Sequence, residues 1–311
     1  MKRLLTICAV AAFVMTLGNT VQAANWHVPV DFATIQAAID SSSVGAGDTI
    51  IVGPGNHKGA LVTKSIKIKG EGGAVINDGP AHSSGLIQGF RLLAGSDGAT
   101  ISHLNFINVD LVIMNGDGVD NVTVKNCTFT NSIQAISNWG GSGWQISHNT
   151  IIDLRTRSGG GIGILVADYT GGKIANNVVS HNKISGTLHV SQGDCGGYDG
   201  SGIVLYADFR WGRLGAEEIR HNRVVHNTVS LVSDTPALVD VAAFELTDTR
   251  DNENALSTIF DNAIGFNDFR GTALQIVLTP LNLGDVNDIS RNLGDNRGHG
   301  LHPSVFGPGG I

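Results

Sequence analysis

The chain has few charged residues, prolines and cysteines, and these shortages exclude several classes of protein. Charged residues make up 15% of the 311 residues, well below the roughly 25% of an ordinary globular domain, which excludes a charge-rich coiled coil or helical bundle. Only 7 prolines accompany 42 glycines, and the glycines keep no period of three, which excludes collagen. The formal net charge of −7 excludes the basic composition typical of nucleic-acid-binding proteins. A hydrophobic content of 41% is enough to form a core and argues against disorder.

The first residues have the pattern of a secretory signal peptide. Lys2 and Arg3 precede an apolar run over residues 4–17, which is too short to span a membrane as a stable helix. Small residues follow, and we expect cleavage before Ala24. This divides the chain into a signal peptide over residues 1–23 and one domain over residues 24–311, whose formal net charge is −9 because both lost charges are basic. No later stretch approaches transmembrane length, so we predict a secreted or periplasmic protein without a transmembrane segment.

Two cysteines remain after the signal peptide, and they allow two interpretations. An exported protein can form disulfides, so a bridge between Cys127 and Cys195 is one alternative. The other is that Cys127, which lies beside Thr128 and Phe129, is a small buried hydrophobic residue.

A repeat of paired asparagines organises the rest of the chain. Two asparagines lie five residues apart, with apolar residues between and after them, and a short strand-like run follows each copy. No helical run of ten residues separates these strands, so the chain is expected to coil, with each strand beside its equivalent in the previous turn. The copies begin at Asn126, Asn177, Asn222 and Asn262, with a degenerate copy at Asn149 and a last fragment over residues 292–296.

The asparagines are expected to stack, since asparagine tolerates the left-handed conformation of a tight bend and its amide can hydrogen-bond along a ladder. A histidine directly precedes several of these asparagines. Their place in the repeat explains these histidines better than a metal site does. The histidines concerned are His148, His181, His221 and His226.

The segment over residues 31–39 is predicted to form a short helix that caps the first coil. Ile35, Ala38 and Ile39 share one helical face, and Asp31 is a suitable N-cap residue. Such a cap is needed because an open coil end exposes both core residues and strand edges.

The opening of the predicted domain resembles that of right-handed parallel β-helix proteins of the pectin-lyase-like superfamily. The resemblance is carried by residues 33–39, 47–52, 55–57 and 66–70, and the asparagine repeat is similar to that of other branches of the superfamily. It covers the whole predicted mature chain. The resemblance implies an all-β fold, a single-stranded right-handed parallel β-helix with a short N-terminal capping helix and about ten coils. It implies no single function, because the superfamily includes lyases, hydrolases, esterases, epimerases and non-catalytic surface proteins.

Most of the superfamily's catalytic motifs are missing. The aspartate motifs of pectin methylesterases and the Trp-Ile-Asp-His and Arg-x-Pro-x-x-Arg motifs of pectate lyases are absent from the sequence. Of the polygalacturonase motifs only Gly-His-Gly around His299 is present, without its acidic partners.

Candidate site residues are therefore expected at the irregular points of the repeat, where long loops over residues 185–200 and 208–216 interrupt it. Long loops on a rigid scaffold commonly carry binding and catalytic residues. Two Asp-x-Arg sequences follow strands, and their arginines could hold a carboxylate, or their aspartates calcium; the alternative is turn capping with an exposed ion pair. The residues are Asp208, Arg210, Asp248 and Arg250, with Arg213 nearby as a further substrate-binding candidate.

A second group is predicted on the outward face of the sheet. Phe244 and Leu246 should point inward, which turns Glu245 outward. We expect Tyr206 and Gln275 to flank Glu245 in neighbouring coils and to bind sugar with Asp199, although a solvated strand face is the alternative.

Two functions remain open on this sequence. The first is a polysaccharide lyase or glycoside hydrolase that uses Glu245 with Asp208 or Asp248 as its carboxyl pair and an arginine to neutralise a substrate carboxylate. The second is a non-catalytic, glycan-binding or structural scaffold at the cell surface or in the periplasm. Both imply a polysaccharide partner and no nucleic acid; calcium is the one cofactor considered, no other metal site is expected, and the protein is expected to be a monomer.

Overall fold

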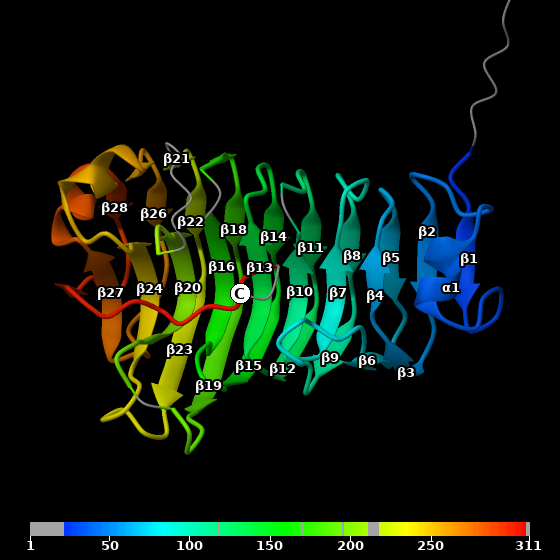
Figure 1. The fold of residues 1–311 in the computed structure, drawn as a ribbon, viewed down its shortest axis with the longest axis horizontal. Helices are drawn as coiled ribbons and strands as arrows, with labels where there is room; N and C mark the ends of the chain where they lie inside the picture. Colours follow the sequence, from blue (N-terminus) through cyan, green and yellow to red (C-terminus); the bar gives the residue numbers. More distant parts are fainter. Residues whose placement is uncertain (1–21, 117, 169–170, 195, 211–217, 309–311) are drawn as a thin grey trace, which may run out of the picture.

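The computed structural model describes residues 22–116, 118–168, 171–194, 196–210 and 218–308, and within them it shows a parallel β-helix (Figure 1). Every pairing between named strands is parallel, and each strand lies against its equivalent in the next coil. No helix among these residues is long and apolar enough to cross a membrane. The all-β coiled architecture predicted from the repeat is therefore confirmed.

Three long sheets form the walls of the coil, and a short fourth sheet joins them in the C-terminal half. The ten-stranded sheet contains β1 (Asn25–Val28), β2 (Thr49–Val52), β5 (Lys67–Gly70), β8 (Thr100–Ser102), β11 (Thr123–Lys125), β14 (Gln145–Ser147), β18 (Val178–Ser180), β22 (Arg223–Val225), β26 (Ala263–Gly265) and β28 (Asp288–Ser290). The nine-stranded sheet contains β4 (Ala60–Val62), β7 (Gln88–Leu92), β10 (Leu111–Asn115), β13 (Gln134–Trp139), β16 (Ile162–Asp168), β20 (Gly200–Ala207), β24 (Val241–Asp248), β27 (Leu274–Thr279) and β29 (Arg297–Gly298).

The remaining strands form the other two walls. The seven-stranded sheet contains β3 (Gly55–Lys58), β6 (Ala74–Asp78), β9 (Asn105–Ile107), β12 (Thr128–Ser132), β15 (Thr150–Arg155), β19 (Lys183–His189) and β23 (Thr228–Ser233). The short sheet contains β17 (Lys173–Ala175), β21 (Glu218–Arg220) and β25 (Ile259–Phe260). Two 3-10 helices, Glu253–Ser257 and Leu281–Asp285, lie in the last coils.

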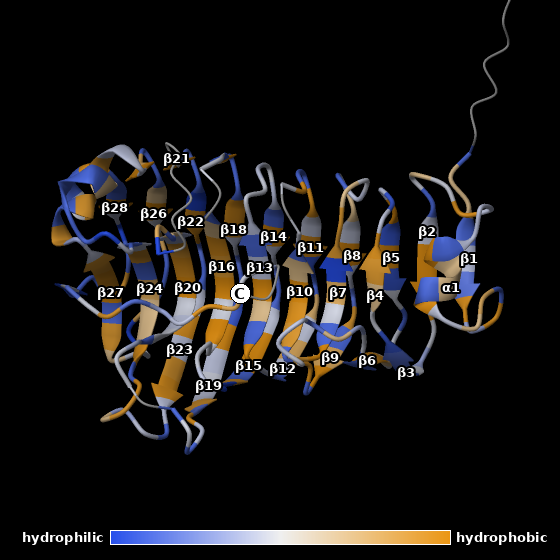
Figure 2. Ribbon diagram, viewed as in Figure 1, coloured by the Kyte–Doolittle hydropathy of each residue, from blue (hydrophilic) through white to orange (hydrophobic). Residues whose placement is uncertain are grey.

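The interior of the coil is filled by one continuous hydrophobic cluster. Strands of the ten-stranded sheet alternate between buried and exposed residues, as in Lys67–Gly70, where Ile68 points inward. Strands of the nine-stranded sheet differ, because hydrophobic residues occupy consecutive positions on β10 and β16 (Figure 2). A strand that is hydrophobic at both parities is buried on both of its faces.

Two ladders of buried asparagines run along the coil, as the repeat predicted. After the first asparagine of each ladder, each side-chain carbonyl accepts hydrogen bonds from the backbone and the side-chain amide of the asparagine one coil earlier. One ladder contains Asn177, Asn222, Asn262 and Asn287, and the other contains Asn149, Asn182, Asn227, Asn267 and Asn292.

The assignment of the first repeat copy is wrong. Lys125 pairs with Ser147, so Cys127 and not Asn126 occupies the ladder position that Asn149 takes one coil later. Asn126 instead adopts a left-handed φ of 54° at the bend before the ladder. A five-residue spacing recurs at more than one corner of the coil, so spacing alone could not fix the register.

Replacing Asn222 with leucine is expected to lower the free energy of unfolding by about 1–3 kcal/mol, because buried amides lose their partners. Asn222 Nδ2 donates to Asn262 Oδ1 at 3.0 Å, and Asn222 Oδ1 accepts from Asn177 Nδ2 at 2.9 Å. Thermal or urea unfolding measures the change, and the exposed Asn254→Leu is the matched control. Equal unfolding midpoints for the two variants would contradict a stabilising role for the ladder.

The N-terminal cap forms as expected but starts later. Helix α1 (Ile35–Asp40) buries Ile35, Ala38 and Ile39 against the first coil. Its N-cap is Thr34, whose hydroxyl accepts from Ala37 N at 3.0 Å, and not Asp31. The Asp31 carboxylate accepts from His27 N at 2.7 Å instead, so it closes the turn before the helix.

The C-terminal segment over residues 299–308, here called the strap, crosses the outer face of the nine-stranded sheet (Figure 1). It runs back over β24, β20 and β16 towards the earlier coils. Val305 and Phe306 contact a second hydrophobic cluster on this face, outside the coil. The cluster contains Leu86, Leu111, Met114, Ile133, Trp139, Ile162, Leu165, Ala167, Val204 and Tyr206. The strap explains why strands such as β16 are hydrophobic on both faces.

Candidate functional site

Most residues predicted for the site lie on or beside the outer face of the nine-stranded sheet. Glu245 points away from the coil interior while Phe244 and Leu246 belong to the inner core, as expected. The predicted column of neighbours is wrong, however, because the register places Val204 and Val277 beside Glu245. Tyr206 pairs with Thr247.

Glu245 and Tyr206 are not solvent-exposed. Each has 0% exposed surface, and the Tyr206 hydroxyl has no hydrogen-bond partner among the described residues. The Ser201 hydroxyl donates to Glu245 Oε1. Burial, followed by the charge of Asp199, raises the pKa of Glu245 well above its usual value. Burial also raises the pKa of Tyr206, with the charge of Asp208 as the next cause. A carboxyl group in this place does not reach a polymer in solution.

The two Asp-x-Arg sequences form closed ion pairs. Arg210 donates to both oxygens of Asp208 at 2.9 and 2.8 Å, and Arg250 donates to both oxygens of Asp248 at 3.0 and 2.5 Å. Both aspartates are buried. The side chain of Arg250 also lies over the ring of Phe209, with its guanidinium carbon 3.5 Å from the ring centroid. In each pair the arginine therefore neutralises its own aspartate, and the two pairs fix the ends of β20 and β24.

These pairs do not fit a calcium site. Calcium takes six to eight oxygen ligands, whereas both carboxylate oxygens of Asp208 and of Asp248 already accept guanidinium hydrogen bonds. No group of three or more His, Cys, Asp or Glu residues in the described chain is arranged to hold a metal ion.

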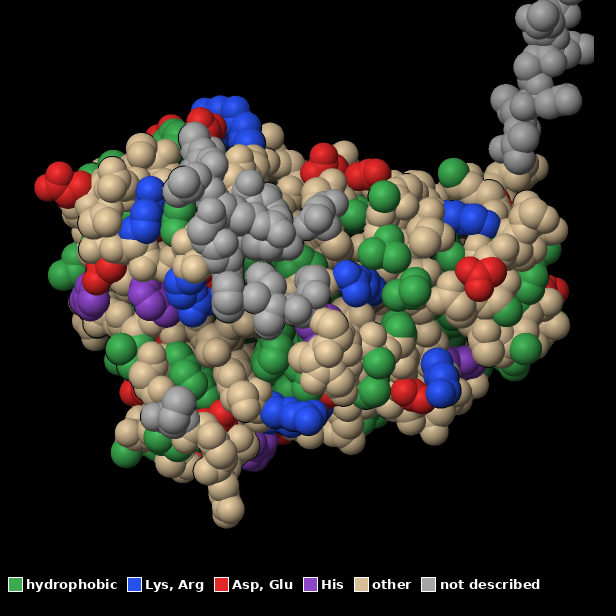
Figure 3. Space-filling view, viewed as in Figure 1, with side chains coloured by type: hydrophobic (Ala, Val, Ile, Leu, Met, Phe, Trp, Pro, Cys, Tyr) green, Lys and Arg blue, Asp and Glu red, His purple; other side chains and the backbone are tan. Residues whose placement is uncertain are grey.

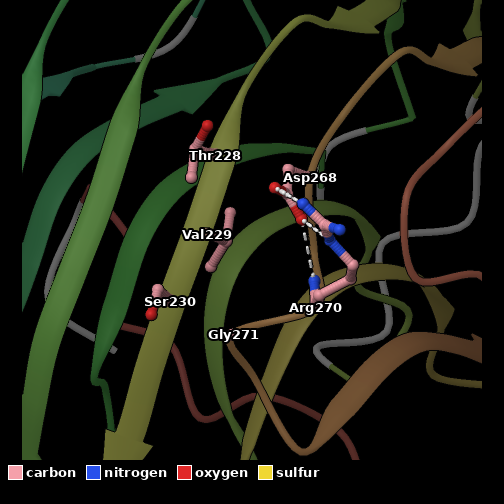
Figure 4. A pocket seen from close by; sticks show the side chains of 6 residues that line it. All are labelled: Thr228, Val229, Ser230, Asp268, Arg270 and Gly271. Carbon is pink, nitrogen blue, oxygen red and sulfur yellow. Dashed lines mark hydrogen bonds and ion pairs between the residues drawn. The ribbon is translucent and has the colours of Figure 1, made fainter.

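A third Asp-x-Arg sequence repeats the same geometry in a surface depression. Arg270 donates to the two oxygens of Asp268 at 2.9 and 2.8 Å (Figure 4). Thr228 and Ser230 line this depression beside the pair. Asp268 thus neutralises Arg270, as in the two buried copies. The recurrence is consistent with the turn-capping ion pair given as the alternative, except that the aspartates of two copies are buried and not exposed.

Asp199 binds the strap. It is only 4% exposed, and its Oδ2 accepts a hydrogen bond from Leu301 N at 3.0 Å, while its own N–H donates to the His302 carbonyl at 3.3 Å. Burial raises the pKa of Asp199 to about 6, and the charge of Asp240 adds to this effect. Asp199 therefore has a structural partner in the place where sugar binding was predicted.

The other end of the strap is held by side chains of earlier coils. Gln134 Nε2 donates to the Phe306 carbonyl at 3.2 Å, and Phe306 N donates back to Gln134 Oε1 at 2.5 Å. Arg91 donates to the Pro308 carbonyl at 2.6 Å, and His82 Nε2 lies 3.0 Å from Gly307 O. These contacts hold the strap against the face from which a substrate would have to enter.

The remaining predicted residues do not join Glu245. The Gln275 side-chain carbonyl accepts from Asn296 N at 3.0 Å, so it links two coils. His299 Nε2 lies 3.0 Å from Asp251 Oδ2 in an exposed pair. Arg213 and Cys195 lie outside the described residues. Cys127 is a free, buried thiol whose pKa burial raises to about 12, which favours the hydrophobic interpretation and not the disulfide.

Three of the four histidines that precede ladder asparagines form an exposed stack, while His221 Nε2 lies 4.0 Å from Asp261 Oδ2 instead. The ring centroids of His148 and His181 are 4.9 Å apart and nearly parallel, and His226 and Phe266 continue the stack at 5.0 and 5.2 Å. The lone pairs of an imidazole lie in the plane of its ring, so those of nearly parallel rings about 5 Å apart do not converge on a shared ion. The predicted structural role of these histidines is consistent with this geometry.

Sequence reasoning missed the strap and the basic part of the ten-stranded sheet. The strap could have been suspected from two apolar residues, Val305 and Phe306, after the last repeat fragment. The alternation of apolar and polar residues on β5 and β11 predicts that Lys67, Lys69 and Lys125 point outward. Their closeness in space could not be predicted, because it depends on the pairing of β5, β8 and β11.

The chain matches the family described as "right handed beta helix region" over residues 66–241, more than half of its length, and it belongs to that family. The predicted fold class is thereby confirmed. The chain is also similar to a protein named "Cell surface glycoprotein" from Methanothermus fervidus, with 30% identity over 151 residues. That stretch is 46% of this chain and 22% of the relative, so the chain covers less than a quarter of that protein. No solved structure matches the chain significantly.

Proposed function

We propose that the protein is a non-catalytic β-helix scaffold that works outside the cytoplasm, at the cell surface or in the periplasm. One observation carries the proposal: the face where the predicted catalytic residues gather is covered by the chain's own strap. Glu245 is fully buried there, and Asp208 and Asp248 are each occupied by a neighbouring arginine. A hydrolase needs two reachable carboxyl groups, and a lyase needs an available cation and a base.

The location rests on two further observations. The first 23 residues have the composition of a signal peptide, and a protein similar to half of this chain is named a cell surface glycoprotein. On the face shown in Figure 3, the described Lys, Arg, Asp and Glu side chains are scattered and do not outline a charged cleft. This surface suits a scaffold better than an enzyme acting on a charged polymer.

Purified protein is expected to leave polygalacturonate, alginate and neutral glycans uncut. The assay records new reducing ends and, separately, the ultraviolet absorbance of unsaturated uronate products. A lyase would give both signals and a hydrolase only the first. Either signal, if lost in Glu245→Gln, would overturn the proposal, as would activity that appears only when the chain is truncated before residue 299 and so lacks the strap.

A further inference from the structure

The outer face of the ten-stranded sheet carries a group of lysines near the N-terminal end of the coil. Lys67 and Lys69 project from β5 and Lys125 projects from β11, since the intervening Ile68 and Val124 point into the core. Ser102 on β8 pairs with Lys69 on one side and Lys125 on the other. The three lysines therefore lie on one face within three neighbouring coils. They are here called the lysine face.

The cations of the lysine face have no acidic partner among the described residues, unlike several others on this acidic protein. Lys58 Nζ lies 2.6 Å from Asp78 Oδ2, and Lys173 Nζ lies 3.6 Å from Glu218 Oε2. The arginines described above bind their own aspartates. None of Lys67, Lys69 and Lys125 takes part in such an ion pair. A protein whose net charge is −7 thus presents unpaired positive charge in one place.

The lysine face borders a long, shallow depression of about 470 Å³. It crosses β1, β2, β5, β8 and β11, and five neighbouring strands at about 4.8 Å spacing give it a length of about 19 Å. Its other lining residues are mostly polar and include hydroxyl groups, which can exchange hydrogen bonds with sugar hydroxyls. They are Asn25, Thr49, Ile51, Thr100, Ser102 and His103.

We propose that the lysine face binds a linear acidic polysaccharide whose carboxylate or sulfate groups contact Lys67, Lys69 and Lys125. This inference rests on the proposed location of the scaffold outside the cytoplasm. An open depression that follows the coil axis suits an extended chain and does not enclose a small ligand. Single-stranded nucleic acid fits less well, because the depression has no Phe, Tyr or Trp on which bases could stack.

The test compares two triple variants of the full chain that lose the same charge. The first, Lys67→Gln/Lys69→Gln/Lys125→Gln, removes the lysine face, and the second, Lys58→Gln/Lys173→Gln/Lys183→Gln, removes three exposed lysines elsewhere. Binding to polygalacturonate, alginate and dextran sulfate is measured by titration at low and high salt. The unaltered protein should bind at least one of them and weaken in salt. The first variant should bind about tenfold more weakly, and the control within about twofold.

Neutral dextran and single-stranded DNA complete the set of ligands. The carboxylated and sulfated polymers show which anionic group is preferred. The inference is overturned if the unaltered protein binds none of the acidic glycans, if both variants weaken equally, or if DNA binds as tightly as the best glycan. Reducing ends are recorded in the same samples, so cleavage would contradict the scaffold proposal without deciding whether the lysine face binds.

Discussion

Truncation before residue 299, which removes the strap and the three residues after it, is expected to lower the free energy of unfolding by about 3–5 kcal/mol, because apolar burial and several hydrogen bonds are lost together. Val305 and Phe306 leave the outer hydrophobic cluster, and Gln134 and Asp199 lose their partners on the strap. The newly exposed residues of β16 and β20 form a large apolar patch, which favours association between molecules.

Urea unfolding and binding of a hydrophobic dye measure this effect. Deletion of residues 309–311 alone is the matched control and should leave both measurements unchanged. Phe306→Asp tests the same contact without shortening the chain, and it should lose about half of the stability lost by the deletion. A strap deletion that unfolds at the control's midpoint and binds no more dye would show that the strap contributes nothing to this face.

Asp199→Asn is expected to stabilise the protein increasingly as the pH rises. The pKa of Asp199 is about 6 in the folded chain, above the ordinary value of 3.8. An acid with a raised pKa favours its protonated form in the folded state, so wild-type stability falls as pH rises between these two values. This difference in pKa corresponds to a loss of about 3 kcal/mol in the free energy of unfolding once Asp199 is ionised. A protein with the neutral asparagine at this position does not undergo that loss.

The measurement is the difference in unfolding free energy between Asp199→Asn and the unaltered protein at pH 4.5 and pH 8. The gap should widen by about 2 kcal/mol in favour of the variant at the higher pH, because about 1 kcal/mol of the difference is already present at pH 4.5. The charge of Asp240 acts on Asp199, and the charge of Asp199 acts on Glu245. Burial lowers the pKa of His302, so the titration of His302 makes stability rise with pH, opposite to the effect of Asp199. Asp240 and His302 are present in both proteins, but the charge of Asp199 also raises the pKa of Glu245, so the measured difference contains both the titration of Asp199 and its coupling to Glu245. The exposed Asp288→Asn is the control, and a gap that stays constant or narrows would contradict the argument.

The coiled fold was predictable because its determinants recur along the chain. Paired asparagines mark the same bends in successive coils, and the apolar residue after each bend must point inward. Stacking multiplies a weak local signal, so the repeat predicted the ladders, the parallel strands and the need for a cap. The register of the coils was harder to predict, because Asn126 and Asn177 begin similar sequences that lie at different corners of the coil.

The candidate site was predicted less well, because its exposure depends on a segment far away in the sequence. Alternation correctly turned Glu245 out of the coil, but it could not show that residues some fifty to sixty positions later return to cover it. The Asp-x-Arg sequences left open both a ligand-binding role and an ion pair, and in the fold each arginine binds its own aspartate.

The sequence by itself determined the fold class, the stacking of equivalent strands and the inward or outward parity of most strand residues, since these follow from periodic local patterns. The tertiary structure alone decided which outward face is open. The strap buries the face carrying Glu245, while the pairing of β5, β8 and β11 gathers Lys67, Lys69 and Lys125 on an exposed one. The physical reason is that burial and local charge depend on contacts between distant segments, which no local pattern records.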